Sequence, residues 1–172
     1  MEIELERTFL LKYMPKDLKN YPFKEYLDIY FPTKAFHPIT RIRRRGNEYE
    51  ITKKYAIVPG DASQQYEFTI KLTEEEFAEL NQSIDGKRIQ KLRYFYKYND
   101  IPFEIDIFQA NLSGLATADF EFASVEAKND FKMPDFCLAE VTQEKALPGG
   151  RLAGKKYSDI EPILAKYGYQ SL

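Results

Sequence analysis

The chain has 172 residues, of which 44% are hydrophobic, and a formal net charge of −2. This length and apolar content fit a single domain, residues 1–172, with one well-buried core. The slightly acidic balance argues against a non-specific nucleic-acid binder, although it leaves room for a local basic site. No signal-peptide pattern opens the chain, and no apolar run reaches the roughly 18 residues that a membrane-spanning helix needs.

The single cysteine, Cys137, cannot form an internal disulfide. This fits a reducing compartment, and its apolar neighbours indicate a buried thiol rather than a nucleophile. Together these features predict a soluble, cytoplasmic protein with no membrane partner.

Alternating apolar and polar residues predict a fold dominated by β-strands. Aromatic residues favour strands, and the chain has 13 Tyr and 13 Phe but no Trp. Gly46-Asn47 suits the tight turn of a β-hairpin. The expected strands cover residues 2–11, 25–31, 39–45, 48–55, 66–72, 87–98, 101–108, 116–125 and 135–142.

Helices are expected at 74–84, at 125–131 and at 158–166. The first begins with a capping-box pattern, in which Thr73 precedes Glu76 by three residues. No internal repeat or linker divides the chain, so the helices are expected to pack on the same domain as the strands.

The first expected strand carries a row of acids. Because alternate side chains of a strand point to opposite faces, Glu2, Glu4 and Glu6 share one face and apolar residues share the other. Carboxylates that lie this close together raise one another's pKa unless basic side chains or a divalent metal ion lie among them.

The later strands also place mixed charges opposite an apolar face. Closed into a barrel, such strands would pack their aromatic faces outward and converge their charged faces on a water-filled interior. Burying so many charges is costly unless they are paired or hold ligands. A polyphosphate gripped by the bases, with Mg²⁺ held by the acids, satisfies both sets.

These residues resemble, in order, the motifs of the CYTH superfamily, the triphosphate tunnel metalloenzymes. The similarity covers nearly the whole chain. The matching segments are Glu4-Leu5-Glu6-Arg7-Thr8, Arg41-Ile42-Arg43 with Lys53 downstream, Lys71, Lys91-Leu92-Arg93, Glu104-Ile105-Asp106, Ala118-Asp119-Phe120-Glu121-Phe122, Ala139-Glu140-Val141-Thr142 and Tyr157.

The resemblance implies an α+β, β-dominated fold: a closed eight-stranded antiparallel β-barrel, or tunnel, with helices packed outside. It implies hydrolysis of a triphosphate, inorganic or small and organic such as thiamine triphosphate, with Mg²⁺ or Mn²⁺ as cofactor. The implied metal ligands are Glu4, Glu6, Glu104, Asp106, Asp119 and Glu121. The implied triphosphate ligands are Arg41, Arg43, Lys53, Lys71, Lys91 and Arg93, and the implied catalytic residues are Glu4, Glu6, Lys91 and Arg93.

Several alternatives stay open in the sequence. Lys53 and Lys54 compete for one position, because a one-residue shift of register reverses the face. The general base is Lys91 or a metal-bound water. Thr8 stands where the motif has lysine, and a hydroxyl can hydrogen-bond a phosphate but cannot neutralise it. Thr8 therefore keeps a non-catalytic polyphosphate- or nucleotide-binding protein as an alternative function, and a class IV-type adenylate cyclase is the second alternative. A homodimer is the expected candidate for self-association.

Two further signals are set aside. The stretch 149–156 nearly spells a Walker A loop, but Lys156 replaces the Ser or Thr that would bind Mg²⁺. His37 is the only histidine and is expected on the surface.

Overall fold

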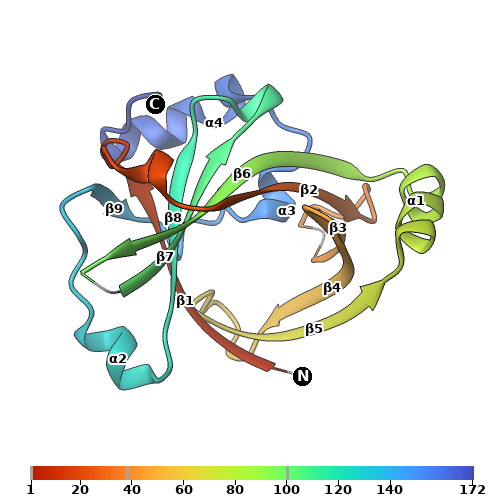
Figure 1. Ribbon diagram of the computed structural model, residues 1–172, viewed down its shortest axis with the longest axis horizontal. Helices are drawn as coiled ribbons and strands as arrows, with labels where there is room; N and C mark the ends of the chain where they lie inside the picture. The colour runs from red at the N-terminus through yellow and green to blue at the C-terminus, as the bar shows by residue number, and fades with distance from the viewer. Residues whose placement is uncertain (1, 38, 100) are drawn as a thin grey trace.

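The computed structural model describes residues 2–37, 39–99 and 101–172, and of Glu2 only the backbone. Eight antiparallel strands close into a barrel in the order β1-β5-β4-β3-β2-β6-β7-β8, with β8 pairing back to β1 (Figure 1). The closed eight-stranded barrel is therefore confirmed. Its strands are β1 (Glu2–Leu11), β2 (Phe23–Phe31), β3 (Thr40–Arg45), β4 (Glu48–Ala56), β5 (Gln64–Leu72), β6 (Lys87–Tyr98), β7 (Ile101–Phe108) and β8 (Ala116–Glu121).

Closure depends on β1, which has three partners. β8 pairs with it from Glu6 to Leu10, while β5 pairs with its first residues and a short ninth strand, β9 (Cys137–Glu140), with its last. β9 thus extends the sheet beside the barrel without entering the ring. The strand expected at 135–142 is shorter than predicted.

Within the described residues, four α-helices lie around the barrel: α1 (Glu74–Ser83), α2 (Val125–Asp130), α3 (Gly149–Leu152) and α4 (Tyr157–Leu164). Thr73 caps α1 as expected, since its hydroxyl accepts from the Glu76 N–H and the Glu76 carboxylate accepts from the Thr73 N–H. Phe77 of α1 packs on Ile42 outside the barrel. The strand expected at 116–125 ends at Glu121 instead, and Ser124 caps α2.

Many of the outward-facing aromatic side chains form one hydrophobic cluster. Phe9, Phe103 and Phe136 are buried together between the barrel wall and the chain segment leading to β9. This confirms the expected outward packing of aromatic side chains.

The inward face is not charged throughout, contrary to the sequence expectation. At one end, Tyr30, Ile89 and Phe108 pack on Leu152 of α3 and Ile160 of α4. The stretch 149–156, which nearly spells a Walker A loop, contains α3 and so contributes to this apolar cluster at one end of the barrel. No helix in the described ranges is long and apolar enough to cross a membrane.

Candidate active site

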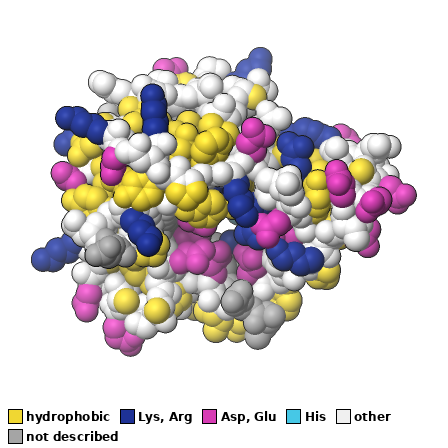
Figure 2. Space-filling model, viewed as in Figure 1, with side chains coloured by type: hydrophobic (Ala, Val, Ile, Leu, Met, Phe, Trp, Pro, Cys, Tyr) yellow, Lys and Arg dark blue, Asp and Glu magenta, His cyan; other side chains and the backbone are white. Residues whose placement is uncertain are grey.

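The barrel encloses a cavity of about 770 Å³, lined by alternate residues of all eight strands. Figure 2 looks into it and shows acidic and basic side chains gathered around a central hollow. Most of the bases lie close to acids, and these groupings determine what each part of the cavity can bind.

Three carboxylates converge on the wall formed by β1 and β8. Glu4, Glu6 and Glu121 each offer an oxygen, and these atoms lie within 4.8 Å of one another. Glu6 lies opposite Glu121 in the antiparallel register, which brings them together. Mg²⁺ and Mn²⁺ prefer such oxygen ligands, so the donor set fits a hard divalent cation. The side chain of Glu2, expected on the same face, lies outside the described residues.

Glu6 and Asp119 carry a proton more readily than ordinary carboxyls. Burial, followed by the charges of Asp119 and Glu4, raises the pKa of Glu6 to about 8. Burial also raises the pKa of Asp119, although Arg93 opposes it. Thr8 lies between the two acids: its hydroxyl is 2.9 Å from Asp119 Oδ1 and 3.3 Å from Glu6 Oε1. Because Thr8 adds no positive charge, a bound cation would relieve this repulsion.

Arg43 is held by an acid that sequence reasoning missed. Asp28, on β2, accepts from Arg43 Nε at 2.6 Å and from Nη2 at 2.7 Å, and both side chains are buried. Burial opposes ionisation, yet the Arg43 guanidinium holds the pKa of Asp28 well below its ordinary range. The signal was available in the alternation of Tyr26, Asp28 and Tyr30, which places Asp28 on the face that lines the cavity.

Arg93 is surrounded by three of the predicted metal ligands. It donates to Asp106 at 2.6 and 2.5 Å, to Asp119 at 2.9 Å, and to Glu104. Lys91 also donates to Asp106, which is buried. The structure therefore separates the six predicted acids into two groups: Glu104, Asp106 and Asp119 close to Arg93, and Glu4, Glu6 and Glu121 together on β1 and β8.

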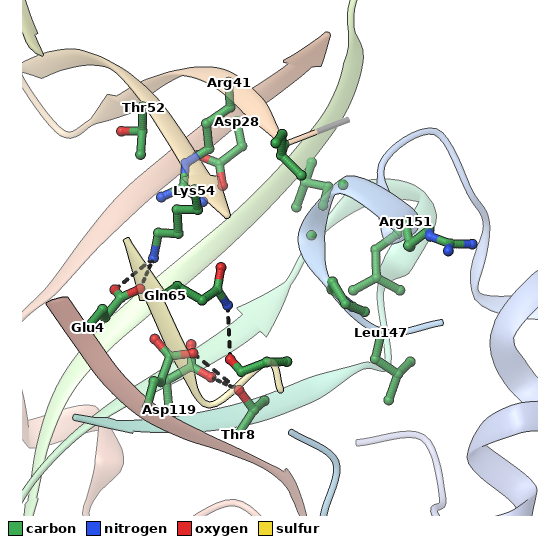
Figure 3. Close-up of a pocket in the computed structure, with 18 of the residues that line it drawn as sticks. Glu4, Thr8, Asp28, Arg41, Thr52, Lys54, Gln65, Asp119, Leu147 and Arg151 are labelled. Carbon is green, nitrogen blue, oxygen red and sulfur yellow. Dashed lines mark hydrogen bonds and ion pairs between the residues drawn. The ribbon is translucent and has the colours of Figure 1, made fainter. Parts of the chain in front are cut away.

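Lys54, and not Lys53, lines the cavity, which corrects the predicted assignment. In β4 the residues that face inward are Glu50, Thr52 and Lys54, so the intervening Lys53 lies on the outer face and is exposed. Lys54 Nζ lies 2.7 and 2.5 Å from the two oxygens of Glu4 and 2.8 Å from Glu67 (Figure 3).

Two predicted phosphate ligands lie apart from these close ion pairs. Arg41 donates to the Tyr30 hydroxyl at 3.2 Å, and its buried Nε has no hydrogen-bond partner among the described residues. Lys71 lies at the cavity rim, where its side chain is 65% exposed and 3.7 Å from Glu50. Both are accessible to an anion that enters the barrel.

Known proteins resemble this chain in both sequence and architecture. The inorganic triphosphatase of Nitrosomonas europaea is 35% identical over 153 residues, covering 87% of this chain and 96% of the relative. The crystal structure of the inorganic triphosphatase NE1496 has a TM-score of 0.65 at 28% identity, covering 90% of this chain and 97% of that one. The chain belongs to the CYTH superfamily.

Other comparisons are less specific. The PH1012 protein from Pyrococcus horikoshii is 17% identical with a TM-score of 0.52, over 97% of this chain and 91% of that one, which shows a shared fold. No family model matches the chain.

The structure adds Asp28 and Glu50, which the motifs did not predict, and decides for Lys54 over Lys53. Asp28, Glu50 and Lys54 line the cavity, and each lies two residues from another inward-facing residue. Cys137 is buried and His37 is exposed, as expected.

Proposed function

We propose that this CYTH protein is a divalent-metal-dependent triphosphatase that hydrolyses inorganic triphosphate. The observation that carries the proposal is the charged cavity, in which three carboxylates and a set of buried bases line the same enclosed space. A relative that is 35% identical carries the name inorganic triphosphatase, which supports the same substrate. A small organic triphosphate is the second substrate to test.

Glu4, Glu6 and Glu121 would hold the Mg²⁺ or Mn²⁺ ion, with Asp119 close enough to support them. When bound, such an ion neutralises developing charge on the phosphate oxygens and orients the substrate. Arg41, Arg43 and Lys71 would contact the phosphates, since a guanidinium fork can bind two phosphate oxygens at once. Arg93 would lie between the phosphates and its three acids.

Lys91 is the proposed general base. Burial and the nearby positive charge of Arg93 lower the pKa of Lys91, so its neutral form is easier to reach than that of an exposed lysine. Attack of water in line with the leaving phosphate would then proceed through positioning and charge stabilisation, because phosphoryl transfer demands little covalent participation from the protein.

The test is phosphate release from inorganic triphosphate, thiamine triphosphate and ATP, each with Mg²⁺, Mn²⁺ or chelator. Glu4→Gln and Arg43→Ala should abolish release, whereas Lys53→Ala, on the outer face of the same barrel, should retain it. If no substrate releases phosphate while triphosphate still raises the unfolding temperature, the protein is a binder and the proposal fails.

We also propose a homodimer and a cytoplasmic location. Exposed apolar side chains on the outer faces of β1 and β5 support the dimer: Ile3 is 59% exposed, Phe68 39% and Ile70 66%. The buried free thiol of Cys137 supports a reducing compartment. Light scattering of the natural protein and of Ile70→Lys tests the dimer, which the charged variant should dissociate.

A further inference from the structure

Lys54 occupies the position of a cation at the carboxylate cluster. Its ammonium lies 2.7 and 2.5 Å from the two oxygens of Glu4, so it grips both ends of one carboxylate. Glu4 is also one of the three acids whose oxygens lie within 4.8 Å of one another. The same oxygens therefore face two alternative positive partners, a lysine from β4 and a divalent ion.

These two partners cannot both stay in close contact with Glu4. An ion bound to either Glu4 oxygen would lie only a few ångströms from the Lys54 ammonium, where like charges repel strongly in a partly buried site. The lysine is the partner able to move, because its charge lies at the end of four flexible methylene groups. It also has a second anchor, Glu67, at 2.8 Å.

Lys54 enters the cavity close to Arg41, which has a hydrogen-bond donor without a partner among the described residues. Arg41 and Lys54 lie on neighbouring strands, β3 and β4, and both side chains line the cavity. Arg41 Nε is buried without a hydrogen-bond partner among the described residues. Figure 3 shows both side chains entering the cavity from neighbouring strands. A phosphate between them would accept a hydrogen bond from Arg41 Nε and another from the displaced Lys54 ammonium.

We propose that Lys54 is an exchangeable counter-ion of the metal site: a divalent cation displaces its ammonium from Glu4, and the released ammonium then binds a phosphate oxygen of the substrate. This inference rests on the proposed function. It makes Lys54 a positioning residue that couples the two ligands, because the metal that needs Glu4 also supplies the free lysine that the triphosphate needs.

The first test measures metal affinity in the absence of any anion. Mn²⁺ is titrated into the full-length protein, and free Mn²⁺ is counted by its electron paramagnetic resonance signal. Lys54→Met should bind Mn²⁺ about tenfold tighter than the natural protein, a typical coupling between two ligands of one site. Lys54→Arg, which keeps the charge, and Lys53→Met, the neighbouring lysine on the outer face, should bind as the natural protein does.

A structural role for Lys54 makes the opposite prediction. If Lys54 only held Glu4 in position, Lys54→Met would bind Mn²⁺ more weakly or equally, and either result overturns the inference. Phosphate release by the natural protein would then leave the proposed function standing. A natural protein that neither binds Mn²⁺ nor releases phosphate overturns both proposals.

The second test uses only the natural protein, in case Lys54→Met does not fold. The ¹⁵Nζ resonance of Lys54 is assigned by its absence from the spectrum of Lys54→Arg and followed as diamagnetic Mg²⁺ is added. It should shift on saturation with Mg²⁺, and shift again when imidotriphosphate, a hydrolysis-resistant analogue, is added. A resonance that stays unmoved while Mg²⁺ saturates the protein overturns the inference.

Discussion

The buried pair of Asp28 and Arg43 yields a quantitative prediction for Asp28→Asn. Asp28 is 2% exposed and Arg43 7%, and two hydrogen bonds of 2.6 and 2.7 Å join them. Removing one partner of a buried ion pair costs about 3–5 kcal/mol, because the remaining charge stays buried without compensation. Glu50 lies 4.0 Å from Arg43 Nη1 and would compensate in part.

We therefore expect Asp28→Asn to lower the free energy of unfolding by about 3 kcal/mol, the lower end of that range. For a chain of this size such a loss lowers the unfolding temperature by roughly 6–12 °C. Urea unfolding followed by far-UV circular dichroism measures it, since the chain has no Trp to report by fluorescence. Inorganic triphosphate should stabilise the variant more than the natural protein, because it supplies Arg43 with a new anionic partner.

Two controls make the result interpretable. Glu48→Gln removes the acid that pairs with Lys24 and Arg45 on the surface, and it should cost much less stability than Asp28→Asn. The double variant Asp28→Asn with Arg43→Met removes both buried charges and should recover part of the stability. If Asp28→Asn costs no more than Glu48→Gln, the reasoning about this buried pair is refuted.

The pH dependence of the same difference follows from the sign of the pKa shift. Because Arg43 holds the pKa of Asp28 below its ordinary value, the stabilisation is present above the unfolded pKa of 3.8 and is lost as the pH falls further. The difference in the free energy of unfolding between the natural protein and Asp28→Asn should be constant from about pH 6 to 9 and become smaller only in acid.

Three further predictions concern the metal site, the apolar cluster at the α3 end of the barrel and the thiol of Cys137. Burial raises the pKa of Glu6 to about 8 in the folded protein, against 4.5 in the unfolded chain, so the metal-free protein should lose stability as the pH rises between these values. Glu6→Gln should make the unfolding temperature depend less on pH over this range. An unchanged pH dependence would contradict the assignment. Gly149→Ala places a Cβ 2.2 Å from the Tyr30 hydroxyl and should cost about 1–3 kcal/mol in urea unfolding, less in a Tyr30→Phe background; an equal cost in both would exclude that clash. Burial raises the pKa of Cys137 to about 12, so at pH 8 the folded thiol should react with a thiol reagent at least about a hundredfold more slowly than in urea, and equal rates would show an accessible thiol.

Much of the fold followed from local sequence pattern. The two-residue period of a strand is a property of the backbone, so alternation alone separated inward Arg41 and Arg43 from outward Ile42 and placed Glu4 and Glu6 on one face. The capping box at Thr73 is equally local, and it fixed where α1 begins. The charged interior of the barrel was therefore visible before any pairing was known.

Register and contact between distant strands were decided only by the tertiary structure. The choice between Lys53 and Lys54 depends on how β4 pairs with its neighbours, since both residues suit a strand and a shift of one position exchanges their faces. The pairing of Asp28 with Arg43 likewise depends on which strand lies beside β3.

The three-dimensional neighbours of each acid also lay beyond the sequence. Glu121 joins Glu4 and Glu6 because β8 pairs with β1, whereas Asp106, on β7, is drawn to Lys91 and Arg93. Local periodicity determines which side of a strand a residue faces, but the energy of a buried charge depends on partners that arrive from elsewhere in the chain. The sequence therefore determined that the barrel would have a charged interior, and the folded structure decided which charges meet there.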